Sequence, residues 1–462
     1  MARLNNTFFL FTIILLEGFI VLSSELLAIR QTLPFVGSGT DTFSIIIAAV
    51  LMPLAFGYQS GGHFKLKRKD GSFQSIRKKL LSNIIIASAI LLPGMSFLIL
   101  NLFFFGLEGM GIDNALIRLT IYCLLFLAFP VYLLGQTVPL ISNYFSKERL
   151  SKTTGYMLCF STLGSFAGSI ATTLVLMQHI GVHHTTSVLF GLLTLLVFML
   201  SKKKMNDQSM IMLGLFGICL ILNSYSVMDI LHIVKNNKYS TIMIMTLNEE
   251  NDETPHLIIN NNDSSKYSKE GIKHDYVELA ERITLDSIPK DAPPKDVLII
   301  GAGGFTFGHN DEKNNFVYID IDKDLKEISE KYLLKEKLKS NKTFYPLPAR
   351  AYLNYTAKKF DIVLLDAYLG GLSIPEHLVT QEFFQSIKTH IKDNGVLVTN
   401  FILSPNFNNI FSKSIDDTMR SVFPHISRQN TEHDYNLWSE NNTLSANIMY
   451  IYKHNNSPIE AE

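Results

Sequence analysis

The sequence predicts an α-helical transmembrane bundle of six or seven helices, followed by a small β unit and a doubly wound α/β domain. Three observations support this prediction. The 462 residues are 47% hydrophobic, long apolar stretches recur through the first half, and short apolar runs alternate with helical patterns in the second. We place the three parts at residues 1–228, 229–290 and 291–462.

The two halves of the chain carry opposite charge. Residues 1–228 contain 16 Lys and Arg against 8 Asp and Glu, and the remainder contains 25 against 33. An acidic second half argues against a nucleic-acid partner, because phosphate binding depends on clustered cations. The three cysteines lie in apolar runs without metal-ligand spacing, so we expect neither disulfides nor a metal site; they are Cys123, Cys159 and Cys219.

The first half contains repeated stretches long enough to cross a bilayer, which takes about 20 mostly apolar residues. The predicted spans are 7–29, 42–62, 81–105, 116–141, 155–178 and 182–200. A seventh segment, 210–228, is weaker because polar residues follow Leu222, so it is either a crossing or an interfacial piece. The first stretch lacks a cleavage pattern and contains Glu17 and Glu25, so we expect it to be retained as a helix.

Basic residues predict the orientation of this bundle. Lys and Arg gather in the loops 63–80, 142–154 and 201–208, which predicts that these loops and the N-terminus lie on the cytoplasmic side of the membrane. The second half then lies outside if 210–228 crosses the bilayer, and in the cytoplasm if it does not.

Two features inside the predicted spans have alternative interpretations. Glu25 and Arg30 are either functional groups at membrane depth, in the extreme a transport pathway, or interfacial residues whose side chains reach the headgroups. The small residues from Gly164 to Gly168 predict close packing against another helix. We see no inverted repeat of the kind found in secondary transporters, and a plain anchor is the favoured role.

The second half predicts alternating strands and helices. Residues 241–245 and 256–259 are expected strands of the small β unit, and 275–288 is a helix that ends before Pro289. Helices are also expected at 323–339 and 380–392. Short apolar runs predict buried parallel strands; these runs are 297–300, 316–319, 360–365 and 396–399.

Candidate site residues follow these strands at their carboxyl ends, where doubly wound sheets bind ligands. Gly301, Gly303 and Gly304 follow the first strand, Asp320 ends the second, and Asp366 follows the run 360–365. Glycines let a ligand approach the backbone, and a carboxylate about 20 residues further on suits ribose hydroxyls.

The glycine turn matches neither the Gly-Lys-Ser/Thr pattern nor Gly-x-Gly-x-x-Gly, so we expect a nucleoside without a pyrophosphate clamp. An S-adenosyl compound is therefore favoured over NAD, and the domain is predicted to be Rossmann-like, of the S-adenosyl-methyltransferase type. The alternative is that the glycines only form turns and the aspartates only cap helices.

The motifs resemble those of the spermidine synthase family of polyamine aminopropyltransferases, and the whole chain resembles the bacterial membrane-fused members. The matching stretches in the second half are 297–304, 318–322, 360–366 and 374–384, and those in the first half are 25–30, 35–37 and 57–62.

The resemblance implies transfer of an aminopropyl group from decarboxylated S-adenosylmethionine to an amine such as putrescine, with no permanently bound cofactor. Asp366 would remove the proton from the attacking amine. Asp320 would hold the ribose, the glycine turn would pass the methionine-derived chain, and Tyr276 and Glu278 would line the amine channel. For Tyr276 and Glu278 an ordinary amphipathic helix is the equal alternative.

Four positions depart from the family pattern. Phe305, Pro348 and Leu369 stand where the family has acidic residues, and Val277 replaces a histidine. Each lost polar contact is worth about 1–3 kcal/mol when buried and charged. The departures leave two alternatives to the transferase, a non-catalytic nucleoside-binding membrane sensor and an S-adenosylmethionine-dependent methyltransferase.

The place where the expected donor is made bears on the side of the membrane that the second half occupies. S-adenosyl metabolites are made in the cytoplasm, which favours a cytoplasmic second half over an exterior one. The expected partners are therefore a small amine and the lipid bilayer, and the sequence leaves a homo-oligomer open.

Overall fold

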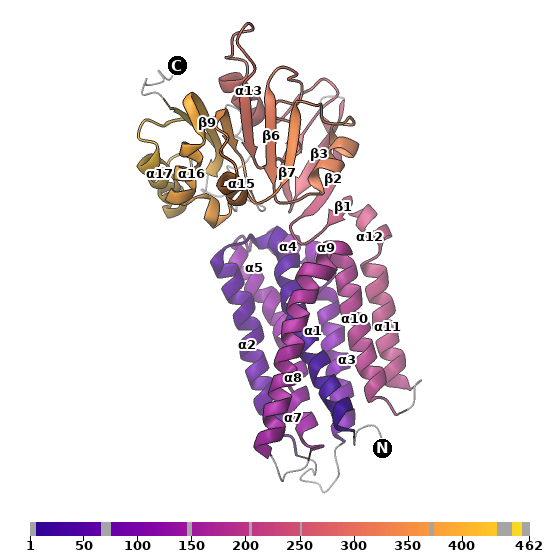
Figure 1. The fold of residues 1–462 in the computed structure, drawn as a ribbon. Coiled ribbons are helices and arrows are strands. Elements are labelled where there is room, and N and C mark those ends of the chain that lie inside the picture. The colour runs from indigo at the N-terminus through magenta and orange to yellow at the C-terminus, as the bar shows by residue number, and fades with distance from the viewer. Residues whose placement is uncertain are drawn as a thin grey trace. The chain divides into compact units, whose positions relative to one another are not determined.

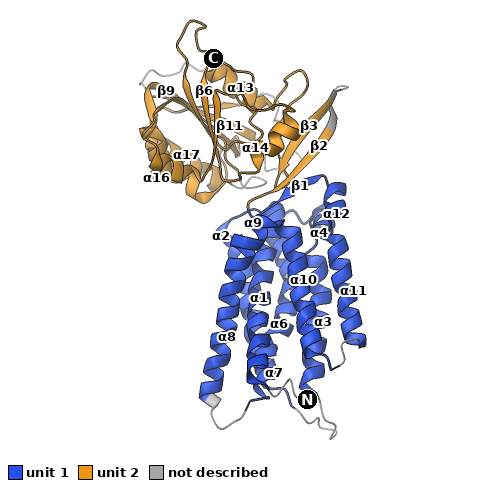
Figure 2. Cartoon of the chain, turned by 45° about the vertical axis from the view of Figure 1, so that its right-hand side comes forward, with its two compact units in different colours: residues 1–238 blue, residues 239–462 orange. Residues whose placement is uncertain are grey.

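The computed structural model describes residues 6–65, 75–145, 150–202, 206–249, 252–368, 374–431 and 446–454. The chain forms two compact units, residues 1–238 and 239–462 (Figure 2). Helix α12 (Tyr225–Ile230) and strand β1 (Ile233–Asn236) fall in the first unit, whereas we expected a separate part to begin at residue 229.

The first unit is a bundle of long helices (Figure 1). The helices that are long and apolar enough to cross a membrane, among the described residues, are Thr7–Val36 (α1), Thr40–Gly62 (α2), Ala115–Ser142, Ser151–His179 and Gly181–Leu200 (α10). The third of these is made of α5 (Ala115–Tyr122), a π-helical stretch (Cys123–Ala128), α6 (Phe129–Gly135) and α7 (Thr137–Ser142). The fourth is made of α8 (Leu150–Ile170), a second π-helical stretch (Ala171–Leu176) and α9 (Met177–His179). Helix α11 (Asp207–Leu222) is apolar but shorter.

The predicted span 81–105 is broken. Helices α3 (Ile76–Gly94) and α4 (Phe97–Gly109) meet at an angle of 66°. Pro93 and Gly94 lie at the break, where proline removes a backbone donor and glycine favours irregular backbone. The Tyr122 hydroxyl donates to the Gly94 carbonyl over 3.0 Å, so one backbone acceptor at the bend is satisfied from another helix.

The predicted small-residue face packs as expected. A Cβ added to Gly164 would lie 2.0 Å from the Leu15 carbonyl oxygen, and one added to Gly168 would lie 2.6 Å from that of Phe19. The Ser165 hydroxyl donates to the Gly18 carbonyl over 3.2 Å. Helices α1 and α8 are therefore in backbone contact, which only glycine allows at these positions.

Arg30 and Glu25 are both buried at the C-terminal part of α1. The Arg30 guanidinium donates to the Asn237 carbonyl over 2.8 Å and to the Asn236 side chain over 3.3 Å. Arg30 thus binds the last residues of the first unit. Glu17 is also buried, and its carboxyl has no hydrogen bond among the described residues.

The second unit begins with an antiparallel meander. Its strands are β2 (Thr241–Glu249), β3 (Asp252–Ile259) and β4 (Asn262–Lys266). We predicted the first two strands. Strand β4, Asn-Asp-Ser-Ser-Lys, has no apolar run and is defined by its pairing with β3.

A mixed sheet follows, with strand order β10-β11-β9-β8-β5-β6-β7. Strands β7, β6, β5, β8 and β9 are parallel, and β11 pairs antiparallel with β9 and β10. The bounds are β5 Asp296–Ile300, β6 Asn315–Asp320, β7 Lys342–Pro346, β8 Phe360–Leu365, β9 Ile391–Leu403, β10 Ser427–Asn430 and β11 Ala446–Lys453. This doubly wound order reverses direction at β5, between β6 and β8, so it confirms the predicted Rossmann-like sheet.

Helices cover this sheet, and their apolar side chains form a hydrophobic core with those of the strands. The elements are α13 (Asp275–Thr284), α14 (Leu325–Ile328) with a π-helical extension (Ser329–Leu333), α15 (Ala349–Tyr355), α16 (Gln381–Thr389) and α17 (Ile410–Val422). Side chains of α15, α16 and α17 pack on Leu298, Ile300, Val363 and Leu365 in one continuous core. The expected helix 323–339 is shorter, since Lys335 adopts a left-handed backbone with φ of 58°.

Candidate active site

The glycine turn after β5 touches the loop that follows β8. Gly301 has φ of 93°, and a Cβ there would lie 1.9 Å from the Asp366 carbonyl oxygen. The Asp366 amide donates to the Ile300 carbonyl over 2.8 Å. Gly301 is therefore required by both its backbone conformation and its neighbour, and the two predicted site segments are adjacent.

The rest of the turn is held from the meander. The Ser265 hydroxyl, on β4, accepts from the Gly304 amide over 2.9 Å. A Cβ on Gly303 would lie 3.0 Å from the same hydroxyl oxygen. The predicted glycines thus form a tight turn packed against β4, a contact that the sequence did not indicate.

Asp320 lies at the end of β6, facing the glycine turn. Its Oδ2 accepts from the Ala302 amide over 3.1 Å, and its Oδ1 accepts from the Asp322 amide over 3.0 Å. Burial, and then the neighbouring Asp322, raise the pKa of Asp320 to about 6, against the effect of these amide bonds. Each carboxylate oxygen keeps a second lone pair, so the group can still accept from a pair of ligand hydroxyls.

Asp366 lies just beyond β8, at the centre of the same sheet edge. Asn400, on β9, donates from Nδ2 to Asp366 Oδ1 over 3.1 Å. Burial raises the pKa of Asp366 to about 6, while the hydrogen bond from Asn400 and the nearby Tyr276 hydroxyl act in the opposite direction. The carboxyl is thus ionised in most molecules at neutral pH and remains basic enough to accept a proton.

Tyr276 and Glu278 lie on different sides of the first turn of α13. The Tyr276 hydroxyl donates to the Ser264 carbonyl over 3.1 Å and also interacts with Asp366. Burial, then the Asp366 charge, hold the pKa of Tyr276 well above its usual range. Glu278 is exposed, and its Oε1 accepts from the Lys273 amide over 3.1 Å. Tyr276 therefore joins Asp366, whereas Glu278 caps the helix start.

The departures from the family pattern have different surroundings. Phe305 is fully buried, with its ring centroid 5.1 Å from that of Tyr318 and 5.2 Å from that of Phe344. Pro348 is exposed just before α15, and Val277 is buried on α13. Leu369 lies outside the described residues. An apolar core side chain thus replaces the expected acid at Phe305.

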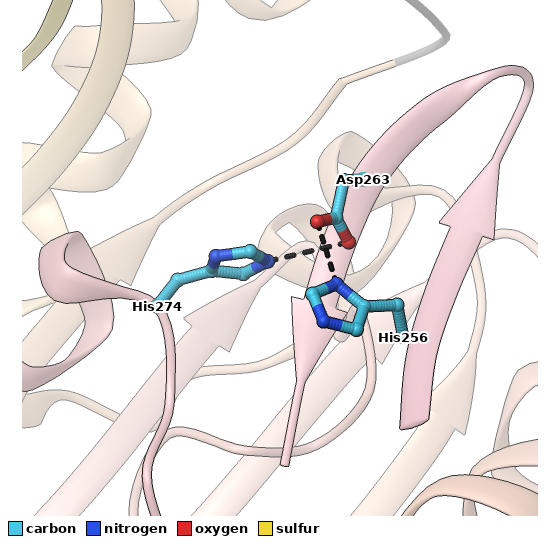
Figure 3. A group of neighbouring side chains, drawn as sticks. All are labelled: His256, Asp263 and His274. Atoms are coloured by element: carbon cyan, nitrogen blue, oxygen red, sulfur yellow. Dashed lines mark hydrogen bonds and ion pairs between the residues drawn. The ribbon is translucent and has the colours of Figure 1, made fainter. Parts of the chain in front are cut away.

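Sequence reasoning missed two groups near Asp366. Asn400 carried a signal, because it is an amide within the apolar run 396–403. The second group is a cluster of two histidines and a carboxylate, His256, Asp263 and His274 (Figure 3). Its members are spread over 19 residues without the usual metal-ligand spacing, and we expected no metal site.

Comparison with known proteins relates part of the second unit to one family. Residues 274–431 match the spermine/spermidine synthase domain. A polyamine aminopropyltransferase of Vibrio vulnificus is 32% identical over 126 residues, which are 26% of this chain and 42% of that protein. The polyamine aminopropyltransferase of Pyrobaculum aerophilum is 26% identical over 255 residues, which are 50% of this chain and 79% of that protein.

The alignment with the Vibrio relative spans less than half of that protein's length. Among solved structures, the spermidine synthase of Thermotoga maritima superposes with a TM-score of 0.32 and 17% identity, covering 47% of this chain and 76% of that structure. The residues that match the family domain, 274–431, lie within the second unit.

Proposed function

From the premise that residues 274–431 form a spermine/spermidine synthase domain, we propose that the chain is a membrane-anchored aminopropyltransferase-like enzyme. The donor is decarboxylated S-adenosylmethionine and the acceptor is a small amine such as putrescine.

One observation carries this proposal: the Asp366 carboxylate, with a pKa raised to about 6, lies beside the glycine turn and between the ends of β5 and β8. Asn400 and Tyr276 hold it from two sides. Perturbed carboxylates at the switch point of a doubly wound sheet are functional candidates on physical grounds. Asp320 is two strands away on the same edge and supports binding of a ribose.

The proposed reaction needs one proton acceptor. An ammonium has no lone pair, so Asp366 first takes a proton from the acceptor nitrogen. That nitrogen then attacks the methylene carbon next to the donor sulfonium, the new C–N bond forms as the C–S bond breaks, and the sulfur leaves as a neutral thioether nucleoside. The new secondary ammonium keeps the two remaining protons of the amine, and its positive charge replaces that of the sulfonium, so charge and atoms balance.

We further propose that the first unit is the membrane anchor. Within the described ranges, five helices are long and apolar enough to cross, or six if α3 and α4 count as one bent span. Their outward faces carry many large exposed apolar side chains, such as Leu51, Phe56 and Leu102. Such a surface needs a covering, and lipid supplies one.

A second candidate, a nucleoside-binding membrane sensor without turnover, is favoured by Phe305. This side chain is buried between aromatic rings where the family pattern has an acid, so one polar donor contact is missing. A sensor would keep donor binding but show no transfer to any amine.

The test is donor binding and turnover in the full-length protein in detergent. Calorimetry with decarboxylated and ordinary S-adenosylmethionine gives the donor preference, and release of the thioether nucleoside gives turnover over an amine panel. We expect preference for the decarboxylated donor, and we expect Asp366→Asn to keep donor binding while turnover falls about 10²–10⁴-fold.

Asp417→Asn is the matched control, because Asp417 is an exposed carboxylate on α17, outside the proposed site. Unchanged turnover in Asp366→Asn would remove Asp366 from its proposed role. Preference for the ordinary donor would favour a methyltransferase, and binding without turnover would favour the sensor.

A further inference from the structure

Two histidines converge on one carboxylate in the second unit. His256 is on β3, Asp263 is on β4, and His274 immediately precedes α13. Figure 3 shows both imidazole rings directed at Asp263. His256 Nδ1 lies 2.8 Å from Asp263 Oδ2, and His274 Nε2 lies 3.4 Å from Asp263 Oδ1. One ligand atom from each residue lies within 4.8 Å of the other two.

These separations suit a shared ion. Zinc binds imidazole nitrogen and carboxylate oxygen at about 2.0–2.2 Å, so two ligands of one tetrahedral ion lie about 3.3 Å apart. The two measured separations bracket that value. His274 Nε2 is buried and makes no hydrogen bond among the described residues, although it faces Asp263 at 3.4 Å. A nitrogen in this position can bind the same ion as the Asp263 carboxylate.

The two histidines of the cluster are more buried than the carboxylate. The His256 side chain is 3% exposed and that of His274 is 21% exposed, whereas that of Asp263 is 41% exposed. The histidine rings are therefore held by packing, and the carboxylate side is open to an entering ion and to a water as fourth ligand. Two histidines with one carboxylate and an open position form a known zinc-binding set.

We propose that His256, Asp263 and His274 bind one divalent transition-metal ion of the zinc class. The ion links the paired strands β3 and β4 to the start of α13. This inference does not depend on the proposed transferase activity, because it concerns a site outside Asp366, Asp320 and the glycine turn.

The proposed ion acts on Tyr276 by position. The ring of Tyr276 stacks on that of His274, with centroids 5.9 Å apart and an interplanar angle of 15°. The Tyr276 hydroxyl donates to the carbonyl of Ser264, the neighbour of Asp263. Both ends of the tyrosine side chain are thus tied to metal ligands or their neighbours, so metal binding fixes the group that contacts Asp366.

The test uses the untagged full-length protein in detergent, treated with a chelator and then titrated with Zn²⁺ by calorimetry. We expect one ion per chain, a rise in melting temperature with Zn²⁺, and the visible absorption of tetrahedral Co²⁺ when cobalt replaces zinc. Mg²⁺, which prefers oxygen ligands, should not bind.

Variants separate this site from other metal-binding surfaces. His274→Ala and Asp263→Asn should each lower Zn²⁺ affinity at least about 100-fold, while His425→Ala, which removes an exposed histidine, should leave it unchanged. His256 is too buried for a safe first variant. Absence of stoichiometric Zn²⁺ binding, or unchanged affinity in both folded cluster variants, would overturn the proposal, whereas loss of transferase activity alone would not bear on it.

Discussion

Single residues at the strand ends determine what the second unit can do. Asp366 and Asp320 have ordinary carboxyl side chains, yet burial raises the pKa of each to about 6. Their hydrogen bonds differ, because Asp320 is held by two backbone amides and Asp366 by side chains from β9 and α13. Side-chain partners can be removed by substitution, so the basicity of Asp366 can be tuned experimentally.

Asn400→Ala should move the acid limb of the pH–rate profile to higher pH. A base must be ionised to act, so kcat/KM falls as pH drops through its pKa in the free enzyme. The Asn400 amide stabilises the ionised form of Asp366, and its loss raises the pKa. We expect the limb to shift upward from about pH 6 by roughly one pH unit, with little change at pH 8 and above.

The control for this measurement is Asn354→Ala, at an exposed asparagine on α15. Its profile should coincide with that of the parent protein. An acid limb in Asn400→Ala that stays in place, or moves to lower pH, would contradict the assignment of that limb to Asp366.

At the scale of elements, the sequence predicted what hydrophobic pattern alone can specify. Strands β5, β6 and β8 are buried on both faces and appear as apolar runs, so they and the site residues at their ends were predictable. Strand β7, Lys-Thr-Phe-Tyr-Pro, lies at the edge of the sheet and is largely exposed, so its sequence lacks such a run. Strand β11 is apolar, but its antiparallel insertion beside β9 is set by tertiary pairing and breaks the alternation on which the prediction relied.

The same limit applies to the site. Contacts between distant elements have no local signal, which is why the Ser265 contact to the glycine turn and the His256 cluster were not predicted. The bend between α3 and α4 did have a local sequence signal, Pro93-Gly94, but it lies within an apolar run that the prediction treated as a single span.

The α1–α8 contact allows a quantitative test at this scale. Gly164→Ala should destabilise the bundle by about 1–3 kcal/mol, because the new methyl group would lie 2.0 Å from the Leu15 carbonyl oxygen. Gly155→Ala is a matched control on the same helix, since nothing lies within 4 Å of its added Cβ. Helix propensity favours alanine at both positions by up to about 1 kcal/mol. Unfolding of the purified protein in detergent measures the difference, and equal stability of the two variants would show that α1 and α8 are not in backbone contact.

At the scale of the whole molecule, two units of opposite charge follow one another in the chain. The first has a surplus of basic residues and long apolar helices, and the second is acidic and carries the family domain. In the proposed membrane anchor, the side on which the second unit lies depends on α11, which is 16 residues long. Such a helix is about 24 Å long, somewhat less than a hydrocarbon core of about 30 Å.

The contacts of α11 support a crossing. At its start, the Ser209 hydroxyl lies 3.0 Å from that of Ser201, just after α10, and near its end Cys219 lies 4.0 Å from the Thr186 carbonyl, near the start of α10. Helix α11 therefore runs antiparallel along most of α10. A shortfall of a few ångströms is met by local thinning of the bilayer at modest cost.

Hydrogen bonds within the first unit then fix which ends of its helices coincide. Arg30, in the last two turns of α1, binds Asn237, so the chain leaves this unit far from the start of α1 (Figure 1). Arg77, at the start of α3, donates to the Leu200 carbonyl at the end of α10. The basic start of α3 is thus at the opposite end of α10 from Thr186, and we expect it in the cytoplasm.

We therefore propose that the second unit lies on the exterior side, although donor supply favours the cytoplasm. Cysteines introduced as His425→Cys and Lys152→Cys, both at exposed positions, can be labelled with an impermeant maleimide, with the parent chain as background. In intact spheroplasts we expect labelling at 425, and at 152 only after permeabilisation. Labelling of both positions only after permeabilisation would mean that α11 does not cross, and the donor would then reach Asp366 directly from the cytoplasm.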